Sequence, residues 1–131
     1  MRFMMLMMPK GYENAKPGTM PDAAKVAAMM KYNEELQKAG VLIALDGLHP
    51  HTEATRVTFP GGTAKVTDGP FAEAKEVVGG YWIIEVRSRE EAVQWATRCP
   101  GGEDEMIELR QVFEISEFPP EIQEAVGDFK L

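Results

Sequence analysis

Two strand–helix–strand units, one in each half of the chain, constrain its fold more than any other feature. The first unit begins with Phe3 to Met8, a continuous apolar run that is typical of a central strand covered on both faces. Thr19 and Asp22 have the spacing of a capping box, which places a helix start between the loop and the following helical pattern. That helix is expected to end at Ala39, and Val41 to Leu45 is expected to form the second strand.

The second unit repeats this order. Val77 to Val86 is the most strand-like run, and the paired glycines Gly79 and Gly80 near its start indicate a bulge or a close approach of another backbone segment. Ser88 and Glu91 form a second capping box, which opens a helix. Residues 107–115 then alternate apolar and polar side chains, as a half-buried last strand does.

The first helical pattern contains an apolar stripe made of Val26, Met29, Met30 and Leu36. Methionine side chains adapt to irregular surfaces, so the stripe could form a binding surface. Core packing against the sheet is the favoured interpretation, because the four residues recur at helical spacing.

A hairpin interrupts the two units. Thr55 to Phe59 and Ala64 to Thr67 flank the turn-forming residues 60–63. The complete order predicts an α+β fold, a ferredoxin-like split βαβ with an inserted β-hairpin and both helices on one sheet face. The other face would be left open and apolar, so a homodimer is expected. We expect one domain over residues 1–118 and a short helix or tail over residues 119–131.

Composition narrows the class of protein. The chain has 131 residues, a net charge of −7 and no cluster of Lys and Arg, which argues against direct binding of nucleic acid. The single cysteine, Cys99, fits a reducing compartment. The apolar run near Met1 is too short for a signal peptide, and no run approaches the roughly 20 residues that cross a bilayer. We therefore expect a cytoplasmic protein that does not contact membranes.

The ten residues from Thr67 to Glu76 carry the strongest candidate site. Asp68 opens a turn, where it could accept backbone N–H groups as a purely structural cap or act as a general base or ligand anchor at a pocket rim. The charged residues around it are candidate ligand-binding groups: Glu73, Lys75, Glu76 and, from the last strand, Arg110.

The remaining chemistry-bearing residues give weaker signals. His49 and His51 are two residues apart, as some metal ligands are, but nothing in the sequence completes a metal site, and exposed loop histidines are the favoured interpretation. His49 is a weak candidate for acid–base catalysis. Cys99 is expected to serve packing rather than nucleophilic catalysis. No phosphate-binding glycine motif is present, and neither a metal nor a cofactor is expected.

The stretch from Thr67 to Glu76, with Gly79-Gly80-Tyr81 after it, resembles the DGPF family, a branch of the YCII-related proteins. The segments Gly47-Leu48-His49-Pro50 and Glu108-Leu109-Arg110 are similar to flanking family blocks. The resemblance implies a dimeric ferredoxin-like α+β barrel. It also implies a genomic association with extracytoplasmic-function sigma factors, while the activity of the family is largely unestablished.

This chain departs from the family pattern in two places. Some relatives have a proposed site in which a histidine of the first helix meets an aspartate, but the helix expected over Asp22 to Ala39 contains no histidine. Gln111 stands where relatives often have proline. Two functions follow as hypotheses: a homodimer with a small-molecule pocket in each subunit, and a non-catalytic regulatory or interaction module associated with sigma-factor-dependent transcription. Whether the pocket catalyses a reaction is left open.

Overall fold

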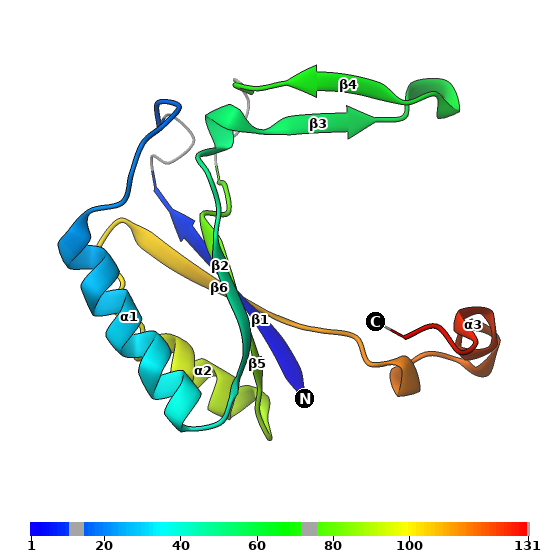
Figure 1. The fold of residues 1–131 in the computed structure, drawn as a ribbon. Helices are drawn as coiled ribbons and strands as arrows, with labels where there is room; N and C mark the ends of the chain where they lie inside the picture. The colour runs from blue at the N-terminus through cyan, green and yellow to red at the C-terminus, as the bar shows by residue number, and fades with distance from the viewer. Residues whose placement is uncertain (11–14, 72–75, 131) are drawn as a thin grey trace.

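A four-stranded antiparallel sheet forms the centre of the protein (Figure 1). The computed structural model describes residues 1–10, 15–71 and 76–130. The strands are β1 (Arg2–Pro9), β2 (Leu42–Gly47), β5 (Gly80–Glu85) and β6 (Glu105–Gln111). Their order in the sheet is β2-β5-β1-β6, so the first strand lies in the middle, as its apolar sequence predicts. The predicted α+β class is confirmed.

Two helices, α1 (Ala23–Lys38) and α2 (Arg89–Thr97), cover the same face of this sheet (Figure 1). Successive residues of β1 alternate between the two faces: Phe3 and Met5 are fully buried under the helices, whereas Met4 and Leu6 are half-buried on the opposite face. The expectation that β1 would be covered on both faces is therefore wrong for the single chain, because both helices lie on one side.

The predicted helix starts are correct in position but differ in detail. Asp22, not Thr19, is the N-cap of α1, and its carboxylate accepts a hydrogen bond from the backbone N–H of Lys25 at 3.3 Å. Ser88 caps α2 as predicted and accepts a hydrogen bond from the N–H of Glu91 at 3.1 Å. A cap satisfies N–H groups that have no partner in the first helical turn.

The predicted core stripe of α1 is correct for Met29 and Leu36 but wrong for Val26 and Met30. The residues that face the sheet are Met29, Tyr32, Asn33 and Leu36, which have the spacing of a helix face. Val26 is 42% exposed and Met30 is 50% exposed. Tyr32 is buried because its ring packs edge-on against Trp82 and its hydroxyl donates a hydrogen bond to the carbonyl of Trp95 at 2.6 Å.

Two strand boundaries also differ from the prediction. β5 begins at Gly80, where a Cβ would lie only 3.0 Å from the carbonyl oxygen of Asp46, so the paired glycines do mark a close backbone approach. The irregularity in strand pairing lies elsewhere, between Leu42 and Ala44 of β2. β6 ends at Gln111, before the predicted boundary at residue 115.

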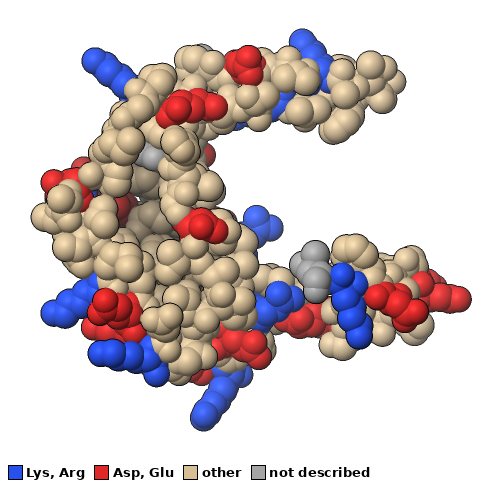
Figure 2. All heavy atoms as spheres, viewed as in Figure 1, with Lys and Arg blue, Asp and Glu red and all other residues tan. Residues whose placement is uncertain are grey.

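The inserted hairpin forms as predicted, from β3 (Thr55–Thr58) and β4 (Lys65–Asp68) with a short 3-10 turn, η3 (Pro60–Gly62), at its tip. In Figure 1 the hairpin projects from the sheet on the side opposite to the helices. The C-terminal segment with η4 (Ile115–Glu117) and α3 (Pro120–Val126) projects on the same side. Figure 2 shows the resulting hollow between the two projections.

The C-terminal projection is attached to the sheet at its base. Both Nε and Nη2 of Arg2 donate hydrogen bonds to the carboxylate of Glu114, at 2.8 and 3.1 Å, and the N–H of Val112 donates one to the carbonyl of Arg2 at 2.9 Å. The hydrogen bond from Arg2 lowers the pKa of the Glu114 carboxyl. Within the described ranges, no helix combines the length and the apolar character that a membrane span requires.

Candidate functional site

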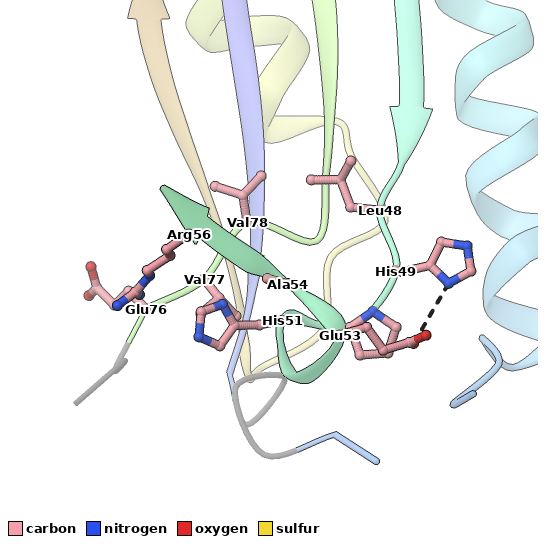
Figure 3. A pocket seen from close by; sticks show the side chains of 10 residues that line it. Leu48, His49, His51, Glu53, Ala54, Arg56, Glu76, Val77 and Val78 are labelled. Carbon is pink, nitrogen blue, oxygen red and sulfur yellow. Dashed lines mark ion pairs between the residues drawn. The ribbon is translucent and has the colours of Figure 1, made fainter. Parts of the chain in front are cut away.

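The main candidate site is a pocket of about 560 Å³ at the base of the hairpin (Figure 3). The connection from β2 to β3 forms one wall, through the 3-10 turn η2 (His51–Glu53), and the segment that leads into β5 forms the other. The N–H of Leu48 donates a hydrogen bond to the carbonyl of Gly79 at 2.9 Å and ties the two walls together. The lining side chains that carry charge or an imidazole ring are His49, His51, Glu53, Arg56 and Glu76.

His51 is the unusual group in this pocket. Its ring packs against Phe71 with centroids 5.3 Å apart. Its Nε2 atom is inaccessible to solvent and has no hydrogen-bond partner among the described residues. Buried polar atoms are nearly always hydrogen-bonded, so this imidazole nitrogen is an exception within the described part of the chain. The expectation that His51 is an exposed loop histidine is wrong.

Phe71, the aromatic residue of the Asp-Gly-Pro-Phe stretch, links two polar groups of the pocket. The guanidinium carbon of Arg56 lies 3.8 Å from the centre of its ring, an arrangement that favours a cation. His51 contacts the same ring. Phe71 therefore holds the imidazole and the guanidinium in place.

His49 lies at the rim of the pocket. Its side chain is 85% exposed, and its Nδ1 atom lies 3.7 Å from a carboxylate oxygen of Glu53, as Figure 3 shows. The same oxygen of Glu53 accepts a hydrogen bond from the N–H of Gly18 at 3.3 Å. The carboxylate of Glu53 therefore orients the imidazole of His49 at the pocket rim.

Asp68 lies on the exposed end of β4. One of its carboxylate oxygens accepts a hydrogen bond from the hydroxyl of Thr55, its partner across the hairpin, at 2.8 Å. The next residue, Gly69, donates its N–H to the carbonyl of Ala54 at 2.8 Å. Both bonds fasten the hairpin at its base, so Asp68 has a structural role next to the pocket wall.

The other predicted site residues are dispersed. Glu76 lines the pocket, as His49 does. Arg110 lies on β6 opposite Met4, on the open sheet face. Glu73 and Lys75 lie outside the described residues. Glu53 and Arg56 are not among the predicted site residues, although Glu53 follows His49 at a spacing that allows an ion pair within one turn.

Cys99 has the properties of a packing residue. Its sulfur lies 3.9 Å from that of Met29, and burial raises the pKa of its thiol to about 11, with a further contribution from the charge of Glu105. At pH 8 the thiolate fraction would be on the order of 100-fold below that of an ordinary cysteine.

We therefore expect Cys99 to react with a disulfide reagent such as Ellman's reagent at pH 8 at least about 50-fold more slowly than free cysteine does. The rate should recover in denaturant, where burial is lost. A native rate equal to that of free cysteine would show that the thiol is accessible, and Cys99 would then be a candidate nucleophile.

These features define a small α+β protein whose candidate site is a pocket beside its central sheet, lined by charged and imidazole side chains among apolar ones. The chain belongs to the YCII-related domain family, whose model matches residues 1–116. An uncharacterised protein of Rhizobium meliloti (strain 1021) is 39% identical to it over 70 residues. That match covers 53% of the chain and 53% of the relative, so the chain spans about half the length of the curated relative it matches.

Proposed function

We propose that the protein is a homodimer that binds a small polar molecule in the pocket at the base of the hairpin. The observation that carries this proposal is the side chain of His51, which lines the pocket and whose buried Nε2 atom has no hydrogen-bond partner among the described residues. The ligand supplies that partner. Arg56 and Glu76 add one charge of each sign to the pocket lining, which suits a ligand with more than one polar group.

The rim supports a role in proton transfer. His49, oriented by Glu53 at the pocket rim, is the group that we propose exchanges a proton with the bound molecule. Asp68 is proposed to assist from the hairpin base, and Glu73 and Lys75 extend the ligand-binding set beyond the described residues. Arg110 lies on the open sheet face, and we propose that it joins the ligand-binding residues when the dimer forms.

The dimer is supported by the open face of the sheet. Its centre is apolar, with Met4, Leu6 and Ile83 only half-buried, and the hairpin and the C-terminal segment project beyond it (Figure 1). We propose that the sheet order reflects a ferredoxin-like split βαβ, and that a second copy covers this face to form a dimeric α+β barrel. Such an interface would bury on the order of 2,000 Å².

A thermal-shift screen of polar metabolites tests the ligand proposal. A ligand of the folded state raises the unfolding temperature by mass action. The matched variant is His51→Phe, which keeps a ring against Phe71 but removes both nitrogens. We expect at least one compound that stabilises the wild type and has a strongly reduced effect on the variant. The proposal fails if no compound stabilises the wild type, or if every stabilising compound acts equally on both proteins.

A second candidate is a non-catalytic interaction module in which the Asp-Gly-Pro-Phe stretch only fastens the hairpin. The hydrogen bond between Thr55 and Asp68 favours this reading. Membership in the DGPF branch, and with it a link to sigma-factor-dependent transcription, rests on the resemblance of that stretch. In this case the hairpin itself would be the contact surface, since Val57 and Phe59 expose 51% and 67% of their surface.

Asp68→Asn separates the two roles of this carboxylate. Asparagine still accepts the hydrogen bond from Thr55 at similar size, so we expect the free energy of unfolding to change by about 1 kcal/mol or less in urea denaturation. If Asp68 also serves the ligand through its charge, stabilisation by ligands from the screen falls while folding is retained. Unchanged ligand binding would assign Asp68 to the hairpin alone.

A further inference from the structure

A second cavity, of about 360 Å³, lies between the first half of α1 and the ends of β2 and β5. Its walls are mostly apolar and include Met7, Val26, Met29, Leu45 and Trp82. It is separate from the hairpin pocket, whose lining consists of different residues. The volume is within the range of cavities that hold small organic molecules.

Asn33 is the buried polar residue of this mostly apolar wall. Its side chain belongs to α1, is only 7% exposed and lines the cavity. The indole Nε1–H of Trp82 donates a hydrogen bond to its Oδ1 atom at 2.7 Å. Because the indole can only donate, this bond fixes the orientation of the amide. The terminal atom that faces Trp82 is the oxygen, so the other terminal atom is the nitrogen of the NH₂ group, Nδ2.

The NH₂ group of Asn33 is poorly satisfied. Its contact is the thioether sulfur of Met30 at 3.5 Å, and a thioether is a weak acceptor. A buried amide N–H without a good acceptor carries a free-energy cost that a ligand carbonyl could relieve. The polar requirement of this cavity is therefore one hydrogen-bond acceptor.

We propose that this cavity binds a compact, neutral, apolar molecule that presents one carbonyl oxygen to Nδ2 of Asn33. An acceptor is required rather than a donor, because Trp82 already occupies the amide oxygen. A neutral ligand fits better than a carboxylate, since Asp46 and Glu105 line the cavity against the single cation Lys25. An aromatic ketone has this chemistry. The site stands independently of the proposed function of the hairpin pocket.

The test compares acetophenone with ethylbenzene, which has nearly the same shape but lacks the acceptor. Binding is followed by the two tryptophan indole N–H signals in ¹H–¹⁵N NMR spectra of the intact protein, assigned with the variant Trp95→Phe. We expect acetophenone to shift the Trp82 signal, because that N–H is bonded to Asn33 in the cavity wall. Its affinity should exceed that of ethylbenzene by about tenfold, the value of one hydrogen bond.

Two variants test whether the compounds bind in this cavity and contact Asn33. Asn33→Asp keeps an oxygen that can accept from Trp82, but at pH 8 a carboxylate oxygen replaces the NH₂ donor. The preference for acetophenone over ethylbenzene should therefore disappear. Val26→Phe, at a partly exposed position of the wall, should fill space and weaken both compounds by severalfold. Equal affinities of the two compounds in the wild type would overturn the proposal. So would a shift confined to Trp95, or no shift of Trp82 up to the solubility of acetophenone.

Discussion

Ile83→Lys is expected to convert the dimer that we propose into a monomer. Ile83 lies on the open sheet face, where its neighbours on the adjacent strands are Met4 and Ala44. A lysine there would place an ammonium group in an apolar interface with no carboxylate directly across either strand. A two-fold interface contains the change twice, so the free energy of dimerisation should become less favourable by about 4 kcal/mol or more. The dimer dissociation constant should then rise about 1,000-fold.

The measurement is light scattering at micromolar concentration. The wild type should give twice the chain mass of 14.6 kDa, and the variant should give the chain mass itself. Val93→Lys is the matched control, because Val93 is an exposed apolar residue of α2 on the helix side of the sheet, and it should remain dimeric. A monomeric wild type, or an Ile83→Lys protein that still dimerises like the control, would contradict a dimer built on this face.

The α+β class and the sequence of strands and helices could be predicted because each element depends on local information. The apolar run of β1 and the capping residues Asp22 and Ser88 each determine an element from a few neighbouring side chains. Which residues of α1 face the sheet could not be predicted from the apolar residues alone. Tyr32 and Asn33 are buried through specific partners on distant elements, Trp95 and Trp82, and a hydrophobic pattern does not count such residues as core.

The candidate site was predictable only in part. The role of Asp68 follows from the hairpin register, since a turn over residues 60–63 already places Asp68 opposite Thr55. Sequence reasoning could have found that hydrogen bond. The pairing of His51 with Phe71 and Arg56 could not be found in this way, because the chain must turn at η2 and return along β3 and β4 before the three side chains meet.

Gly69→Val is expected to lower the free energy of unfolding by about 2 kcal/mol or more. A Cβ at this position would lie 3.1 Å from the carbonyl oxygen of Ala54 and 3.2 Å from that of Thr52, and 3.2 Å from the ring of Phe71. The two carbonyls belong to the backbone that connects η2 with β3, so they cannot move aside without disturbing the hairpin base. The ring of Phe71 cannot yield without losing its contacts with His51 and Arg56.

The control for this substitution is Gly101→Val. A Cβ at Gly101 would have no atom within 4 Å, and the backbone there is not in the left-handed region. Both variants add the same side chain, so urea denaturation of the two isolates the effect of crowding. Ligands from the thermal-shift screen should also lose affinity for Gly69→Val, because the same backbone carries His51. Equal stability of the two variants would show that the hairpin base is loosely packed, and the rigid wall that the proposed site requires would then be absent.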